Sequence, residues 1–312
     1  MRCLSLLLPI LFFGALAAVE PLNVVTGNTV VQDLAQRIGG ERIVATCLLQ
    51  VGIDPHTYQP TPSDAKSLAD AQLCIINGLG FEGWFEGLVA DADFRGTVVI
   101  ASAGVEVLTM DAEDHHGHAG ADPAHDPAHD HAHDPAGVAD PHAFNSLTCG
   151  IVYAENIRDA LSTADPEGAA LYRANATALI SELRSTDAWA KQLFASIPKS
   201  QRIIITNHDA LQYFARDYAF TILAPNTALE DSEPSPQQVA ALVTLIREQG
   251  VAGIFLEYAK NHAVIEQIAR EAGVATGGEL YLDGLGPADS AAGTYVGMFR
   301  TNVQTIHTAL TR

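Results

Sequence analysis

Two blocks of alternating strand-like and helix-like segments constrain the fold of this chain most strongly. In each block, short runs rich in Val, Ile or Leu alternate with amphipathic segments of helical spacing. The strands predicted in the first block span residues 22–26, 42–49, 72–77 and 97–101, with helices near 29–38, 62–70 and 81–90. Those predicted in the second span residues 202–206, 220–223 and 252–257, with helices near 209–218, 236–248 and 262–272. This alternation predicts an α/β protein of two lobes with mainly parallel sheets.

The stretch between the two blocks carries almost no helix breaker. Residues 167–196 contain no Pro and no Gly after Gly168, and they are rich in Ala, Leu and charged residues. A single helix of about 30 residues would be about 45 Å long and would join the lobes rigidly, whereas two shorter helices with a break are the alternative. We therefore expect an N-terminal lobe over 18–166, a connecting helix over 167–197 and a C-terminal lobe over 198–312.

The first 17 residues have the pattern of a signal peptide. Arg2 precedes a Leu-rich apolar run that ends at Phe13, and Ala15 and Ala17 form an Ala-x-Ala cleavage site. The apolar run is too short to span a membrane comfortably, and no Cys follows the cleavage site to carry a lipid. The sequence therefore predicts removal of residues 1–17 and a mature protein in the periplasm.

Charge and histidine content indicate the class of ligand. The 312 residues include 17 Lys and Arg against 37 Asp and Glu, a formal net charge of −20, together with 12 His. Nucleic acid is excluded as a partner because its binding depends on Lys and Arg side chains that neutralise phosphates. Acidic residues combined with many imidazoles suit a divalent cation.

Residues 111–140 form a low-complexity insertion with seven His, eight acidic residues and no Lys or Arg. Frequent Pro and the lack of apolar anchors predict a flexible loop rather than a helix or strand. A solvated linker is one interpretation, but the density of imidazoles favours weak capture of Zn²⁺, Cu²⁺ or Ni²⁺. The auxiliary metal-binding residues predicted in this loop are His115, His116, His118, His125, His129, His131 and His133.

Outside this insertion, three histidines lie in turn-like settings at the ends of predicted elements. His56 follows the second strand, His142 lies where the insertion rejoins the fold, and His208 follows a strand of the second block. Asp283 follows a further strand-like run. A lone His at a strand end has a structural role as its simplest explanation. In open α/β sheets, however, ligands bind beyond the carboxyl ends of strands, so the shared placement favours one metal site between the lobes.

Several motifs resemble the metal-binding receptors of bacterial ABC importers for zinc and manganese, the cluster A-I solute-binding proteins. The most specific of them is Asp54-Pro55-His56-Thr57-Tyr58. The similarity covers nearly the whole chain after residue 17. The matching stretches, in order, are residues 39–42, 52–64, 77–80, 206–214, 232–235, 254–257, 280–283 and 294–302.

The resemblance implies two Rossmann-like lobes joined by a long backbone helix, with one metal ion in the cleft between them. The ligand positions of the family correspond to His56, His142, His208 and Asp283. The third position is His, as in the zinc importers, whereas the manganese importers have Glu there, and three imidazoles with one carboxylate suit Zn²⁺. The implied function is that of a monomeric periplasmic receptor that delivers Zn²⁺ to an ABC permease in the inner membrane. A periplasmic zinc metallochaperone is a candidate donor.

Two other functions stay open at this stage. A manganese-specific receptor of the same family would use the same positions. A zinc-dependent hydrolase would need three His and an open coordination position. Asp283 would fill that position, and no His-Glu-x-x-His motif supplies a general base. We therefore expect no enzymatic activity.

Residues near the expected ligands have predicted roles of their own. Glu257 ends a strand near the cleft and would hold an imidazole tautomer, and Asp209 would cap the helix that follows it. Residues 144–147 replace the Trp-Leu-Asp-Pro of the family, so packing near His142 is expected to differ. Cys47 and Cys74 lie inside strands as buried small side chains, with a disulfide between them or thiolate ligation of zinc as the alternatives.

Overall fold

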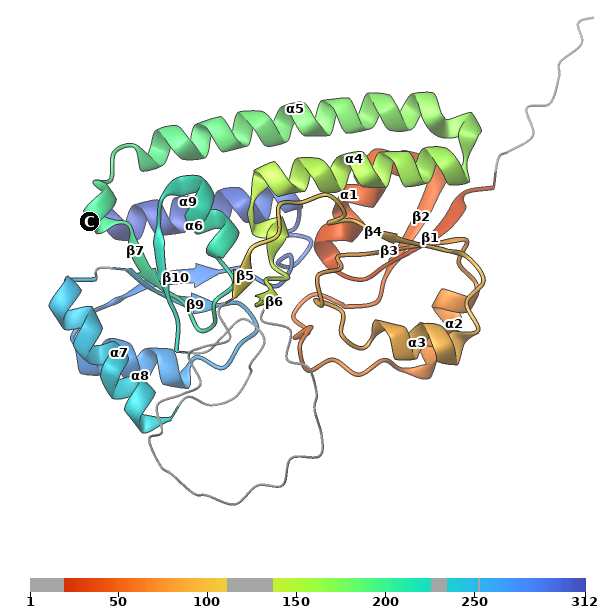
Figure 1. The fold of residues 1–312 in the computed structure, drawn as a ribbon. Helices are drawn as coiled ribbons and strands as arrows, with labels where there is room; N and C mark the ends of the chain where they lie inside the picture. The colour runs from red at the N-terminus through yellow and green to blue at the C-terminus, as the bar shows by residue number, and fades with distance from the viewer. Residues whose placement is uncertain (1–19, 111–136, 226–234, 252) are drawn as a thin grey trace, which may run out of the picture.

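The computed structural model describes residues 20–110, 137–225, 235–251 and 253–312. These residues form two α/β lobes side by side under a shared layer of helices (Figure 1). The predicted signal peptide and the seven histidines of the predicted capture loop lie outside the described residues, so both remain predictions. Within the described ranges, no helix is long and apolar enough to cross a membrane.

The N-terminal lobe is built on a four-stranded parallel sheet in the order β2-β1-β3-β4. Its strands are β1 (Leu22–Thr26), β2 (Ile43–Cys47), β3 (Leu73–Ile76) and β4 (Thr97–Ile100). Neighbouring side chains of a strand point to opposite faces, so Val24 packs towards α1 (Thr29–Gly39), whereas Val25 packs towards the other face. That second face is covered by α2 (Pro62–Ala69) and α3 (Phe85–Ala92).

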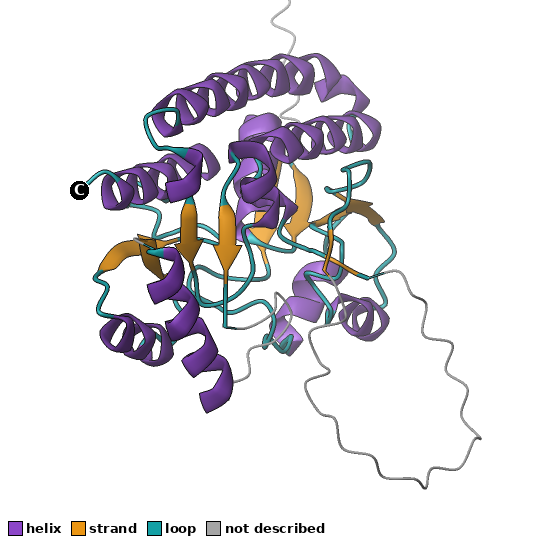
Figure 2. Ribbon diagram, turned by 60° about the vertical axis from the view of Figure 1, so that its left-hand side comes forward, coloured by secondary structure: helices purple, strands orange, loops and turns teal. Residues whose placement is uncertain are grey.

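The C-terminal lobe repeats this plan with the parallel sheet β10-β9-β7-β8. Its strands are β7 (Ile203–Ile205), β8 (Thr221–Leu223), β9 (Gly253–Glu257) and β10 (Thr276–Leu280). Ile205 and Ile254 pack towards α7 (Pro236–Gln249) and α8 (Ala263–Ala272) on one face. The other face is covered by α6 (Gln212–Tyr218) and α9 (Tyr295–Leu310), so helices lie on both sides of the sheets (Figure 2).

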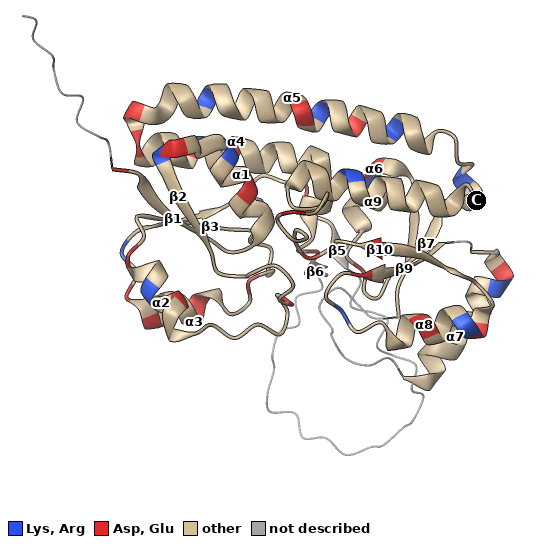
Figure 3. Cartoon of the chain, turned by 180° about the vertical axis from the view of Figure 1, so that it is seen from behind, with Lys and Arg blue, Asp and Glu red and all other residues tan. Residues whose placement is uncertain are grey.

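One long helix crosses above both lobes. Helix α5 (Ala169–Phe194) has 26 residues and is therefore about 39 Å long. It packs on α1 in the N-terminal lobe and on α9 in the C-terminal lobe, and residues of both charges recur along its length (Figure 3). The connector between the lobes is thus one helix rather than two, although it begins after a 3₁₀ turn at Pro166–Gly168.

Helix α4 (Leu147–Ala164) lies beside α5 and was not among the predicted elements. Its first turns contain Gly150 and the β-branched Ile151 and Val152, which have low helix propensity. Tertiary packing overrides that propensity because Tyr153, Ala154 and Ile157 on the inner side of the helix are fully buried. Gly150 is needed there, since a Cβ at this position would collide with the Tyr295 hydroxyl.

A single hydrophobic core runs through the helical layer of both lobes. It includes side chains from α1, α4, α5, α6 and α9 that are at most 2% exposed, namely Leu34, Ile157, Leu183, Phe214 and Phe299. Two smaller clusters fill the opposite faces of the two sheets. The lobes are therefore joined by packed side chains as well as by the chain itself.

Candidate metal centre

The structure brings the four predicted site residues together between the lobes. His56 lies in the loop after β2, His208 in the loop after β7 and Asp283 in the loop after β10. His142 precedes the short helix that leads into α4. One ligand atom from each of the four side chains lies within 4.8 Å of those of the other three. Two side chains come from each lobe, so the cluster exists only when the lobes face each other.

The short antiparallel pair of β5 (Thr109–Met110) and β6 (Val138–Ala139) explains how His142 is positioned after a long insertion. Thr109 pairs with Ala139 and Met110 with Val138, so the chain on either side of the insertion lies side by side. The Asp140 amide then donates to the Leu108 carbonyl over 2.8 Å. These backbone hydrogen bonds fix the chain two residues before His142.

All three imidazoles face the same oxygen of Asp283. The distances from Oδ1 to Nε2 are 3.2 Å for His208, 3.4 Å for His142 and 3.9 Å for His56. The ring centroids of the histidines are 5.2–5.7 Å apart. The Nε2 atoms of His56 and His142 are buried and make no hydrogen bond of acceptable geometry within the described part of the chain. Buried polar atoms are rarely left without a partner, and one cation at this point would satisfy both.

Two carboxylates hold the histidine rings in place from behind. Glu257 accepts from the His208 amide at 2.9 Å and lies 2.6 Å from His208 Nδ1. Asp140 accepts from the His142 amide at 2.9 Å and lies 3.0 Å from His142 Nδ1. A carboxylate on Nδ1 fixes the ring orientation and leaves Nε2 for a ligand. Glu257 thus lies beside an imidazole, as the sequence predicts.

Asp140 was missed by the sequence reasoning, although a signal for it existed. The tripeptide Asp-Pro-His occurs both at residues 54–56 and at residues 140–142. In both copies the aspartate Oδ1 accepts from the amide of the histidine two residues later, at 2.9 Å. The repeat is therefore a local turn that presents an imidazole.

The electrostatics of the cluster favour a charged carboxylate among proton-holding imidazoles. Burial alone would raise the pKa of Asp283, but His208, His142 and His56 hold it well below its usual range. Burial would likewise lower the pKa of His208, but Glu257 and Asp283 raise it well above the ordinary value. The pKa of His142 is raised by Asp140 and Asp283 against the effect of burial. A metal ion entering this site must therefore displace protons.

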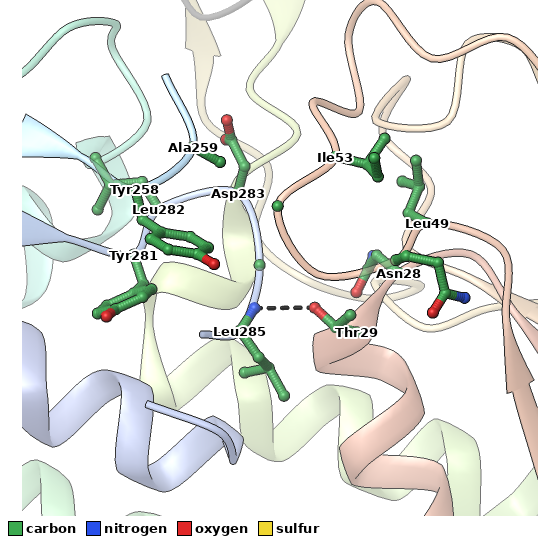
Figure 4. Close-up of a pocket in the computed structure, with 13 residues that line it drawn as sticks. Asn28, Thr29, Leu49, Ile53, Tyr258, Ala259, Tyr281, Leu282, Asp283 and Leu285 are labelled. Atoms are coloured by element: carbon green, nitrogen blue, oxygen red, sulfur yellow. Dashed lines mark hydrogen bonds between the residues drawn. The ribbon is translucent and has the colours of Figure 1, made fainter. Parts of the chain in front are cut away.

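Aromatic rings and a small cavity complete the surroundings. Phe81 lies edge-on to the rings of His56 and His142, each at 5.8 Å between centroids, and Phe144 contacts His142 at 6.2 Å. On the other side, a cavity of about 30 Å³ between the lobes is lined in part by Asp283 (Figure 4). Apolar rings therefore cover the histidines on one side, and the cavity adjoins the cluster at Asp283.

A comparison with known protein families matches residues 24–309 to the family described as zinc-uptake complex component A, periplasmic (ZnuA). The chain belongs to this family. The ZnuA family comprises metal-binding receptors of ABC importers, which work with a membrane permease and an ATPase. They are solute-binding receptors and not enzymes, so the hydrolase alternative is excluded.

Relatives of the family with different metals in their names match most of the chain. The iron-binding protein YfeA of Yersinia pestis is 33% identical over 92% of this chain and 86% of its own length. The manganese-binding lipoprotein MntA of Halalkalibacterium halodurans is 30% identical over 94% of this chain and 90% of its own. The periplasmic zinc-binding protein TroA of Treponema pallidum superimposes with a TM-score of 0.81 at 25% identity, covering 94% of this chain and 100% of TroA. The predicted family and fold class are thus confirmed, and the choice of metal depends on the donor atoms of this chain.

Two other sequence expectations are resolved by the structure. Asp209 does not cap α6, because α6 begins only at Gln212 and the Asp209 carboxylate accepts from the Gln212 side chain instead. Cys47 and Cys74 are buried free thiols and form no disulfide. Strand β1 lies between their strands, which places them about 10 Å apart and beyond the reach of a disulfide.

Thiolate ligation is also excluded for these two cysteines within the described cluster, which consists of His56, His142, His208 and Asp283 alone. Burial raises the pKa of each thiol to about 12. A thiol with such a pKa stays protonated and is a poor metal ligand.

Replacing Glu257 with Gln is expected to weaken Zn²⁺ binding roughly 10-fold to 100-fold. The amide loses the charge that orients His208 and raises its basicity, but it keeps nearly the same shape. Isothermal titration of the metal-free protein with Zn²⁺ measures the change. Glu266→Gln on the exposed side of α8 is the matched control and should bind as the wild type does. Equal affinities of all three proteins would show that Glu257 has no part in ligand orientation.

Proposed function

We propose that this chain is an extracytoplasmic zinc receptor that holds one Zn²⁺ ion between its lobes through His56, His142, His208 and Asp283. The observation that carries the proposal is the convergence of three imidazole Nε2 atoms on one carboxylate oxygen. Two of those nitrogens are buried without a hydrogen-bond partner in the described residues. A bound cation that prefers nitrogen donors would give both nitrogens a partner.

The donor set supports zinc rather than manganese. Zn²⁺ takes four ligands in a tetrahedron and binds imidazole nitrogen well. Mn²⁺ prefers a larger number of oxygen ligands in an octahedral arrangement, and this cluster offers one carboxylate. Sites with nitrogen donors generally bind Cu²⁺ and Ni²⁺ strongly too, so both ions are expected to bind in vitro as well.

The ion is the cargo of the receptor, which hands it to an ABC permease in the inner membrane. We place the mature protein in the periplasm as a monomer, after removal of residues 1–17. The loop at 111–140 would capture ions weakly, directly or from a zinc metallochaperone, and pass them to the tighter site. We also propose the domain limits that the sequence predicts, with an N-terminal lobe over 18–166, a connecting helix over 167–197 and a C-terminal lobe over 198–312.

A competition titration tests the choice of metal. Purified mature protein is loaded with Mn²⁺ and titrated with Zn²⁺, and bound metal is counted after rapid desalting. We expect Zn²⁺ to displace Mn²⁺ at the tight site. The His208→Ala variant is expected to lose that preference, because it lacks one of the three nitrogen donors. Equal or stronger binding of Mn²⁺ by the wild type would overturn the zinc assignment.

A further inference from the structure

Lys260 brings a positive charge to the edge of the candidate metal centre. It lies in the turn after β9 and forms an ion pair with Asp54, which belongs to the loop of the N-terminal lobe that carries His56. Its Nζ is also 3.4 Å from Oδ2 of Asp283. The side chains of Lys260, Asp54 and Asp283 are only 11%, 16% and 14% exposed. This ammonium therefore bridges the two lobes in a largely water-excluded setting.

The two oxygens of Asp283 have different partners. Oδ1 faces the Nε2 atoms of the three histidines, whereas Oδ2 faces the ammonium of Lys260. A carboxylate whose second oxygen is engaged by a fixed cation offers one oxygen to a metal. An ion that moved towards Oδ2 would also approach Lys260, and repulsion between two cations is strong where water is excluded.

Asp54 fixes Lys260 in this position. The carboxylate of Asp54 accepts from the His56 amide at 2.9 Å and pairs with Lys260 as well. If the ammonium turned away from Asp283, it would have to leave Asp54 or carry the His56 turn with it. The residue that presents the first histidine thus also sets the place of the lysine.

We propose that Lys260 is a specificity-determining residue, which restricts Asp283 to one-oxygen ligation and so keeps the site four-coordinate. This inference rests on the proposed function, because it concerns the same ion. Four ligands suit Zn²⁺, whereas Mn²⁺ needs further oxygens that a two-oxygen Asp283 would begin to supply. The lysine would therefore discriminate between metals without touching them.

The coordination number can be read directly with Co²⁺ in place of the cargo. Tetrahedral Co²⁺ absorbs visible light strongly, and five- or six-coordinate Co²⁺ absorbs weakly. We expect the wild-type protein with one equivalent of Co²⁺ to give the intense spectrum. A weak, high-coordinate spectrum of the wild type would overturn the inference without any variant being made.

Lys260→Met removes the charge and keeps the apolar length of the side chain. We expect its Co²⁺ spectrum to weaken and the ratio of its Mn²⁺ to Zn²⁺ dissociation constants to fall at least about tenfold. Lys260→Arg retains a cation opposite Oδ2 and should keep the wild-type ratio. Lys199→Met removes an exposed lysine from the same lobe and is the control for net charge.

The outcomes separate this inference from the proposed function. If the wild type does not prefer Zn²⁺ over Mn²⁺, the proposed function fails. If the wild type prefers Zn²⁺ but Lys260→Met shows the same spectrum and ratio, only the role of Lys260 is overturned. If Lys199→Met loses as much metal selectivity as Lys260→Met, the loss is caused by the change in net charge, and the role of Lys260 is overturned too.

Discussion

Replacing Asp283 with Asn is expected to weaken Zn²⁺ binding by roughly two to three orders of magnitude. Structural zinc sites gain about 10–16 kcal/mol of binding free energy, so an equal share for each of four ligands is roughly 2.5–4 kcal/mol. The amide keeps the size of the carboxylate but loses the charge on which three imidazoles converge. Competition against a chelator of known zinc affinity measures the loss.

The matched control for this variant is Asp289→Asn. Asp289 lies in the same loop six residues later and is exposed. Removing its charge should leave Zn²⁺ affinity within about twofold of the wild type, because distant surface charges are screened by water and salt. If Asp283→Asn binds Zn²⁺ as tightly as Asp289→Asn does, the carboxylate is not a ligand.

A buried carboxyl outside the candidate ligand set is expected to make the metal-free protein less stable as the pH rises. Glu82 is 6% exposed, and burial outweighs the hydrogen bonds that it accepts and raises its pKa to about 7. The folded protein thus holds this proton more tightly than the unfolded chain, in which the pKa is 4.5. The stabilisation is complete below about pH 4.5 and is lost as the pH rises to about 7. The difference of about 2.5 pH units corresponds to about 3 kcal/mol in the free energy of unfolding.

Urea denaturation of chelator-treated protein between about pH 5 and about pH 8 measures this loss. The Glu82→Gln variant cannot ionise, so the wild type should lose stability relative to it across that range. The variant should also be less stable than the wild type by an amount that does not depend on pH. The two oxygens of Glu82 accept from the backbone amides of Asn77 and Gly78, whereas the Gln side chain has only one acceptor oxygen. Glu86→Gln, at an exposed position of α3 four residues after Glu82, should show the slope of the wild type. Parallel pH profiles for the wild type and Glu82→Gln would contradict the prediction.

Glu82 also connects stability with the metal centre. It accepts from the Asn77 amide at 2.9 Å, and the Asn77 side chain donates to the carbonyl of Pro141, the residue before His142. Tyr153 from α4 donates to the same Asn77 side chain at 2.8 Å. Glu82 is therefore linked through one residue, Asn77, to the backbone that precedes a candidate ligand.

The strands and the candidate ligands could be predicted from the sequence because their signals are local. Runs of Val, Ile and Leu identify buried parallel strands, and a turn with His at the end of such a run places the imidazole at the ligand-binding edge of the sheet. His56 and His208 follow this pattern. Glu257, at the end of β9, was predicted beside an imidazole for the same reason.

The remaining features depend on contacts between residues far apart in the sequence. Lys260 lies 206 positions from Asp54 in the sequence, and a local sequence pattern cannot predict an ion pair over that separation. Helix α4 contains poor helix formers that are held by burial. Asp209 has the composition of a helix cap, but the turn around His208, closed by the Thr206 hydroxyl on the His208 carbonyl, delays the start of α6.

The unbroken core beneath the long helix α5 has a consequence for cooperativity. Because side chains of both lobes pack into one cluster, neither lobe can lose its packing without exposing apolar surface of the other. The two lobes should therefore melt as one unit rather than in two steps. An ion bound between them then raises the free energy of unfolding of both lobes together, so that occupancy of a single small site sets how often the shared core opens to a protease.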